Sequence, residues 1–124
     1  MKGILVLAHG SRKSATEHTL EMIMEMLKEL LSDMDCEVEY CFIEFSDRTI
    51  EVGLDTFVNR GIKDIIVIPY FLFDGVHIRE CIPRGIENYL QKHQNEEICI
   101  KLGKTLGADS RLAGILADRI REEI

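Results

Sequence analysis

The sequence lacks an apolar stretch long enough to cross a membrane. Its longest apolar run, residues 65–73, is far short of the roughly 20 residues that a transmembrane helix needs. The apolar start of the chain is too short for a signal peptide and leads directly into a Gly-Ser turn. We therefore expect a soluble, cytoplasmic protein that does not bind membranes.

An excess of basic residues is also missing. Fifteen Lys and Arg stand against 22 Asp and Glu, which gives a formal net charge of −7. Because DNA and RNA are polyanions, the proteins that bind them carry a basic surface. The acidic balance therefore excludes nucleic acid as the expected partner.

Cysteine pairs of the Cys-x-x-Cys type are absent, and so is the ligand spacing of zinc fingers. Cys36, Cys41 and Cys99 lie in or beside apolar runs and are expected to be structural thiols. The chain also has no linker, low-complexity segment or convincing repeat. Its 124 residues predict one domain, 1–124, with a single core and little room for a large enclosed cavity.

Short apolar runs alternate with segments in which apolar residues recur at helical spacing. The expected strands are residues 3–8, 37–45, 65–71 and 98–102, and the expected helices are residues 14–34, 49–59, 83–92 and 110–122. Strands that are apolar throughout are typical of a parallel sheet covered on both faces. The order β-α-β-α-β-α-β-α with right-handed crossovers favours an α/β fold with a four-stranded parallel sheet in strand order 2-1-3-4.

Two histidines follow strands that are neighbours in this order. His9 comes after the first strand and His77 after the third, at the switch point where ligands bind in such sheets. Neutral imidazoles that converge there can bind a divalent metal or accept protons near pH 7, although both could instead be hydrogen-bonded turn residues. Two histidines are too few for a tight metal site, so an open site that transfers metal fits better. His18 and His93 lie in polar surroundings and are expected at the surface.

Basic residues follow every predicted strand. They are Arg12 and Lys13 after the first, Arg48 after the second, Arg79 and Arg84 after the third, and Lys104 after the fourth. Because these positions share one edge of the sheet, to which helix N-termini also point, the edge suits an anionic ligand. Scattered surface charge is the alternative. Glu44, at the end of the second strand, could handle metal, accept protons, or pair with Arg48 or Arg12.

The first predicted helix carries more apolar residues than one sheet face requires. Met22 and Met26 lie about 100° from the centre of its core stripe. These methionines either fill gaps in the core or form a contact surface for a second subunit or a flat apolar ligand.

Five segments together carry a resemblance to a known family. They are GILVLAHGSR at 3–12, FIEF at 42–45, VIPYFLFDGVH at 67–77, IP at 82–83 and LGADSRL at 106–112. In order and spacing, over nearly the whole chain, they resemble the short-form CbiX-type sirohydrochlorin chelatases, which are small class II chelatases. His-Gly-Ser alone would be a weak signal, whereas its combination with P-x-F-L-x-x-G-x-H is specific.

The resemblance implies a chelatase-like half-domain that inserts a divalent metal into sirohydrochlorin without ATP, for cobalamin or sirohaem synthesis. The metal, Co²⁺ first and otherwise Ni²⁺ or Fe²⁺, is a substrate, and no permanently bound cofactor is implied. Short members form homodimers, while longer relatives carry two halves in one chain. His9 and His77 correspond to the metal-binding histidines, and Glu44 corresponds to the glutamate after the second strand; these three are the expected catalytic residues. The expected substrate-binding residues are Ser11, Arg12, Arg48, Gly75, Arg79 and Arg84.

The sequence departs from the family pattern at two positions. Cys81 stands where an acid usually precedes Ile-Pro, so it could be a soft ligand, a packed thiol or neither. Arg48 replaces a common proline and could add a contact to a substrate carboxylate. A response-regulator receiver is excluded, because histidines stand where that fold needs acids. A metal carrier, or a tetrapyrrole-binding module without turnover, is the remaining alternative.

Overall fold

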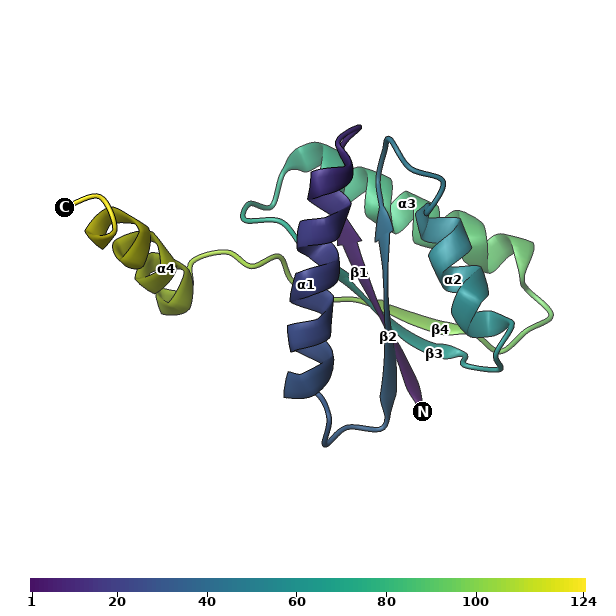
Figure 1. Ribbon diagram of the computed structural model, residues 1–124. Coiled ribbons are helices and arrows are strands. Elements are labelled where there is room, and N and C mark those ends of the chain that lie inside the picture. Colours follow the sequence, from purple (N-terminus) through teal and green to yellow (C-terminus); the bar gives the residue numbers. More distant parts are fainter.

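The computed structural model describes the backbone of residues 1–124 and every side chain except those of Val76 and His77. Its elements are β1 (Lys2–Ala8), α1 (Ser14–Leu30), β2 (Cys36–Phe42), α2 (Ile50–Val58), β3 (Asp64–Pro69), α3 (Val76–Lys92), β4 (Cys99–Leu102) and α4 (Ser110–Arg121) (Figure 1). This is the predicted alternation of strands and helices. No helix in the described part of the chain is long and apolar enough to span a membrane.

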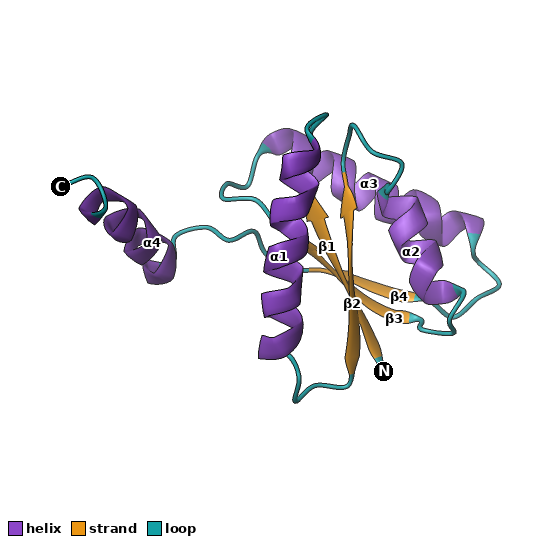
Figure 2. Ribbon diagram, in the orientation of Figure 1, coloured by secondary structure: helices purple, strands orange, loops and turns teal.

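The four strands form one parallel sheet in the order β2-β1-β3-β4, which confirms the predicted fold class. Lys2 at the start of β1 pairs with Cys36 and Asp64, and Asp64 pairs in turn with Cys99. Because all strands run the same way from this register, their carboxyl ends meet at one edge of the sheet (Figure 2). The switch in strand order falls between β1 and β3, so the carboxyl ends of these two strands lie at the centre of that edge.

Successive side chains of β1 point to opposite faces of the sheet and build two cores. Leu5 and Leu7 are fully buried in a core with α2 and α3, to which Phe57 of α2 contributes its ring. Ile4 and Val6 are buried on the other face, together with side chains of α1 and β2. The sheet is therefore covered by α2 and α3 on one side and by α1 on the other.

The last helix, α4, stands apart from these layers (Figure 1). None of its residues is buried. It is joined to β4 by an extended connection, residues 103–109, whose amides pair with the segment that follows β3. Leu106 N–H donates to the Phe71 carbonyl (2.9 Å) and Gly107 N–H donates to the Leu72 carbonyl (3.0 Å). The connection therefore runs along the carboxyl edge of the sheet before α4 begins.

The third helix begins seven residues earlier than the sequence predicts. Pro83 was expected at its start, because proline lacks an N–H and suits the first helical turn. In the structure Pro83 lies inside α3, and Gly75 caps the helix well before it. The other boundaries differ less: the first helix ends at 30 rather than 34, the second strand at 42 rather than 45, and the third at 69 rather than 71.

Some side chains that were expected to be buried are exposed. Among the three thiols expected in the core, Cys41 is buried, Cys36 is half-buried and Cys99 is exposed. Burial raises the pKa of the Cys41 thiol to about 12. Met22 and Met26 are also exposed, so they do not fill gaps in the core. For Cys99 the reason is that no helix covers the α1 side of β4.

Candidate active site

His9 lies immediately after β1, at the centre of the carboxyl edge. Its side chain is exposed, and its ring packs edge-on against Phe71, with 4.4 Å between the ring centroids. Its carbonyl oxygen accepts a hydrogen bond from the Glu44 N–H (3.1 Å), which ties the end of β1 to the segment after β2. Within the described residues no group hydrogen-bonds to the imidazole. The backbone is thus held while the ring nitrogens stay available to a ligand.

Gly10 makes the turn that presents His9. Its φ of +90° is in the region that side chains with a Cβ rarely adopt. A Cβ at this position would also overlap the carbonyl oxygen of Glu44. The chain can therefore leave β1 beside the Glu44 backbone only with glycine at position 10.

Two open, largely apolar hollows meet at His9. One, of about 380 Å³, lies between α1 and the strand ends and is lined by Leu20, Ile23, Phe42 and Tyr70, among others. The other, of about 520 Å³, lies over the segment after β3. It is lined by His9, Tyr70, Phe71, Leu72, Phe73, Gly75, Ile78, Leu106 and Leu112. A histidine between two apolar hollows suits a ligand with a broad apolar face and a polar centre.

Two of the predicted cationic residues lie beside apolar or acidic neighbours at this edge. The Arg12 guanidinium lies over the ring of Phe45, 4.7 Å from its centroid, which is a cation–π contact. Arg79 forms an ion pair with Asp74 (2.5 Å). The hydrogen bond from Arg79 holds the pKa of the Asp74 carboxyl below its usual range. Both arginines are exposed and can reorient toward an anion.

Arg48 does not point toward His9. Its Nε donates to the Tyr40 carbonyl (3.3 Å), its terminal nitrogen pairs with Glu39 (3.3 Å), and its guanidinium lies 3.9 Å from the centroid of the Tyr40 ring. These contacts hold Arg48 along β2. For Glu44, the alternative of an ion pair with Arg48 or Arg12 is not among the contacts of the described residues, and its side chain is exposed.

The remaining predicted site residues lie after β1 and on or before α3. Ser11 Oγ accepts a hydrogen bond from the Lys13 N–H (3.1 Å), and Gly75 precedes the first turn of α3. Arg84 and Cys81 are exposed on α3. The prediction that His77 shares the site lies outside the described residues, because its side chain is not among them. Among the side chains that are described, no group of three His, Cys, Asp or Glu is placed to hold a metal ion.

The comparison with known proteins decides the family. The sequence model of CbiX matches residues 3–123. The chain belongs to the CbiX family. The sirohydrochlorin cobaltochelatase of Saccharolobus solfataricus is 31% identical to this CbiX protein over 126 residues, which cover 98% of this chain and 95% of the relative. The sirohydrochlorin ferrochelatase of Priestia megaterium is 30% identical over 123 residues, which cover 98% of this chain.

The CbiX protein has the length of some relatives and half that of others. It spans 44% of the Priestia megaterium ferrochelatase and 38% of the cobaltochelatase from the same organism. The solved structure of the sirohydrochlorin chelatase SirB from Bacillus subtilis subspecies spizizenii, in complex with cobalt, superposes with a TM-score of 0.83 at 26% identity. That match covers 98% of this chain and 50% of SirB. One copy of the CbiX fold thus corresponds to about half of the longer relatives.

The apolar rim of the site was not among the residues selected from the sequence. Phe45, Tyr70, Leu72, Phe73 and Leu106 are all exposed near the strand ends. Phe45 also has a φ of 60°, the only positive value among non-glycine residues of the described backbone. The sequence does contain a signal for these residues. The apolar runs continue past the ends of the strands, to positions where burial in the core does not explain apolar side chains.

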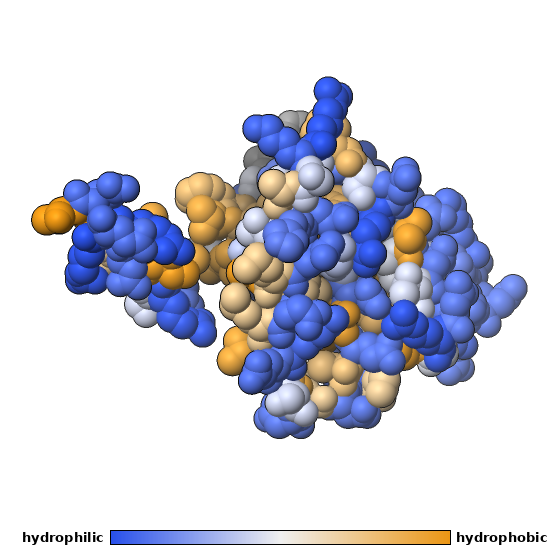
Figure 3. Space-filling view, viewed as in Figure 1, coloured by the Kyte–Doolittle hydropathy of each residue, from blue (hydrophilic) through white to orange (hydrophobic). Residues whose placement is uncertain are grey.

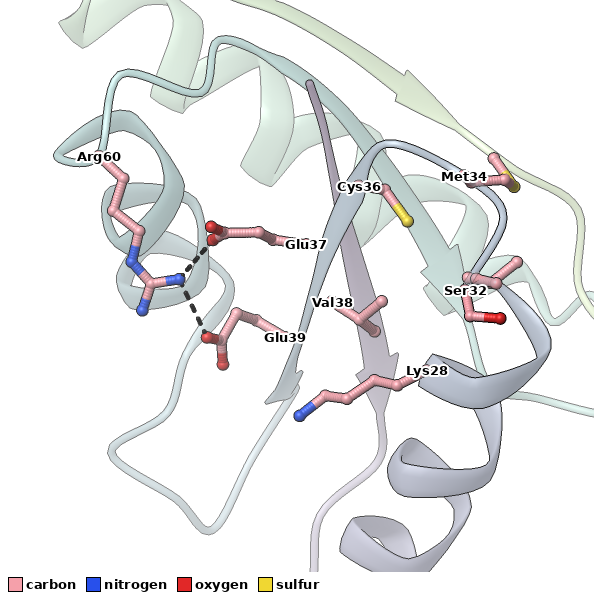
Figure 4. Close-up of a pocket in the computed structure, with 9 residues that line it drawn as sticks. Lys28, Ser32, Met34, Cys36, Glu37, Val38, Glu39 and Arg60 are labelled. Carbon is pink, nitrogen blue, oxygen red and sulfur yellow. Dashed lines mark hydrogen bonds and ion pairs between the residues drawn. The ribbon is translucent and has the colours of Figure 1, made fainter.

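A separate hollow lies beside the start of β2 and shares no lining residue with the two at His9 (Figure 4). Its volume is about 420 Å³. Arg60 is one of its lining residues and pairs with Glu37 (2.6 Å) and Glu39 (3.4 Å). Charged pairs along an edge strand hinder pairing with a foreign strand, so this hollow is explained by protection of the sheet edge.

Proposed function

We propose that this CbiX protein is a sirohydrochlorin chelatase that inserts a divalent metal into the macrocycle without ATP. The observation that carries the proposal is the position of His9, exposed between two apolar hollows at the switch point of the sheet. Cobalt is the first candidate metal, with Ni²⁺ and Fe²⁺ next, and the product would serve cobalamin or sirohaem synthesis. The unit proposed to act is one chelatase-like domain, 1–124, in a homodimer.

The proposed substrate matches the chemistry of the site. Sirohydrochlorin is a flat, apolar ring edged with carboxylates. The ring faces suit the apolar hollow lined by Phe71, Phe73 and Leu106. The carboxylates suit Arg12 and Arg79, which follow β1 and β3 at the same edge of the sheet. Arg84, Ser11 and Gly75 are proposed to contribute to the same contacts. Arg48 can do so only after it leaves Glu39 and Tyr40.

Metal insertion exchanges two protons for one divalent ion. The metal enters the ring as two pyrrole N–H groups lose their protons, so a site must deliver an ion and accept protons. We propose that His9 and His77 bind the ion loosely, replace part of its water and pass it to the pyrrole nitrogens. Glu44, whose backbone is tied to His9, is the proposed additional proton acceptor.

A direct assay tests the function. Purified protein mixed with sirohydrochlorin and Co²⁺, Ni²⁺ or Fe²⁺ is expected to form the metallated ring faster than the same mixture without protein, with no ATP added. The absorbance spectrum of the macrocycle follows the reaction. A rate equal to that of the uncatalysed reaction would refute the proposed chelatase activity. Ring binding without turnover would instead identify a tetrapyrrole-binding module, and metal binding alone would identify a carrier.

Removal of a cation at the site is expected to weaken substrate binding more than turnover. Arg12→Ala and Arg79→Ala should each raise KM about tenfold, equivalent to about 1.4 kcal/mol, because each removes a partner of a substrate carboxylate. Arg60→Ala is the matched control, since Arg60 lines the separate hollow beside β2. Steady-state kinetics measure the effect, and an unchanged KM in both site variants would argue against their role.

A further inference from the structure

The loop after β2 holds an aromatic residue in a backbone conformation that favours glycine. Phe45 has a φ of 60°, a region that bulky side chains avoid because their Cβ crowds the backbone. Burial does not explain the residue, because Phe45 is 51% exposed and belongs to neither core of the described chain. Backbone strain of this kind is found mainly at functional sites. The place of the Phe45 ring therefore needs another explanation.

Hydrogen bonds fix the loop on both sides of Phe45. Before it, the Glu44 N–H donates to the His9 carbonyl (3.1 Å). After it the chain turns back, and the Phe42 N–H donates to the Arg48 carbonyl (2.7 Å). Because the loop is tied down at both ends, the Phe45 ring has a defined place beside the end of β1.

The partner of the Phe45 ring is Arg12, which follows β1. The guanidinium carbon lies 4.7 Å from the ring centroid, within the range of a cation–π contact. The ring covers one face of the planar guanidinium, while the N–H groups of the guanidinium point outward in its plane. Among the described side chains, carboxylates pair with Arg48 and Arg79 but not with Arg12. The stack thus holds the plane of the Arg12 guanidinium and leaves its donors free.

A second stacked arginine shows the opposite arrangement. Arg48 lies over the Tyr40 ring, 3.9 Å from its centroid. Its Nε donates to the Tyr40 carbonyl (3.3 Å), and a terminal nitrogen donates to Glu39 (3.3 Å). The donors of Arg48 are therefore used inside the protein, whereas those of Arg12 are available to a ligand.

The position of Arg12 suits a carboxylate at the edge of a ligand that also reaches His9. Arg12 follows His9 by three residues, and the two apolar hollows meet at His9. Figure 3 shows hydrophilic and apolar side chains side by side at the end of the molecule where β1 and β2 terminate. A guanidinium whose edge is free can bind a carboxylate through two parallel hydrogen bonds. A carboxylate held in this way would fix where the centre of a flat ring lies relative to His9.

We propose that Phe45 is a positioning residue for substrate binding. Its ring holds the Arg12 guanidinium face-on, so that the free N–H groups meet a carboxylate of the macrocycle while the centre of the macrocycle lies at His9. The inference rests on the proposed function and adds a residue to it. Phe45 acts through Arg12, so it governs affinity for a carboxylated ring and not the chemistry at the ring nitrogens.

The first test is binding of metal-free sirohydrochlorin, followed by the absorbance of the macrocycle. Phe45→Leu keeps an apolar side chain but loses the ring, and it should raise the Kd about fivefold. Phe45→Tyr keeps the ring and should stay within about twofold of the wild type. Equal losses in the Leu and Tyr variants would overturn the proposal.

A double-mutant cycle shows whether Phe45 acts through Arg12. In the Arg12→Ala background, Phe45→Leu should change the Kd by less than about twofold, because the group that the ring orients is already gone. A full loss in that background would mean that the ring touches the substrate itself, and it would overturn the positioning role. Tyr40→Leu is the matched control, because it removes the ring under Arg48, which stays paired with Glu39. A Kd raised as much by Tyr40→Leu would also overturn the proposal.

Phe45→Gly separates positioning from support of the fold. Glycine adopts a φ of 60° without steric cost, so this variant should not have a lower melting temperature than the wild type. Its Kd should nevertheless rise as in Phe45→Leu, and its turnover at saturating substrate should stay within about twofold of the wild type. A lower melting temperature together with weaker binding would assign a structural role to Phe45 and overturn the proposal.

The binding and turnover measurements separate this inference from the proposed function. A wild type that binds the macrocycle without metallating it would refute the chelatase, and the Kd series would still decide the role of Phe45. An active wild type whose Kd is unchanged by Phe45→Leu would overturn only the role of Phe45. A wild type that neither binds nor metallates sirohydrochlorin would overturn both.

Discussion

His9→Ala is expected to lower the turnover number for metal insertion by about 100-fold or more. The imidazole lines both hollows, as the Tyr70 side chain also does, and loss of a positioned proton acceptor typically costs this much. His77→Ala is expected to act in the same way if the two histidines share the ion. The measurement is the rate of metallation at saturating sirohydrochlorin and metal.

The control for this variant is His18→Ala. His18 is exposed on α1 and lines the hollow on the β2 side, which does not include His9. Its replacement should leave turnover unchanged. The His9 variant should also keep its melting temperature, because the ring is exposed and its loss opens no buried cavity. Full turnover in the His9 variant would overturn the assignment of His9 as the residue that binds the metal and accepts a proton.

Gly10→Ala is expected to destabilise the fold and to lower turnover together. The substitution combines the cost of a Cβ at φ +90° with the overlap against the Glu44 carbonyl oxygen, and the sum is about 2–5 kcal/mol in the free energy of unfolding. Relief of that overlap must move the segment after β2 away from His9. Urea unfolding measures the first effect, and the metallation rate measures the second.

Gly61→Ala separates the two causes. Gly61 has a similar φ of +82°, but nothing lies within 4 Å of a Cβ added there. This variant should lose only the conformational part, about 1 kcal/mol, and should keep its turnover. Equal losses in the free energy of unfolding at positions 10 and 61 would mean that the Glu44 backbone moves to accommodate the added Cβ at no cost in free energy.

The sheet was predictable because its strands are continuous apolar runs, whereas the apolar residues of its helices recur at every third or fourth position. Apolar runs such as 3–8 can only be buried on both faces, which leaves a parallel sheet and few strand orders. The start of α3 was not predictable in the same way. Proline marks a helix start by a local rule, whereas in this chain the helix begins at Val76, and Pro83 stands within it.

The site was predictable where position along a strand decides it, and not where a side chain has a choice of partners. His9 follows β1 and must lie at the carboxyl edge. Arg48 also follows its strand, but its long side chain folds back to Glu39 and Tyr40. The sequence alone could not show whether Arg48 binds a ligand or pairs with Glu39 and Tyr40. These two partners lie nine and eight residues earlier in the chain, within β2.

The extended connection at 103–109 has a consequence for hydrogen exchange. Its amides at Leu106 and Gly107 are bonded to carbonyls of the segment after β3 rather than within a helix or strand of their own. Local opening of the carboxyl edge would therefore expose these two amides together with the hollow beside His9, which Leu106 also lines. Their exchange rates would report on movement of this edge without any label placed in the site.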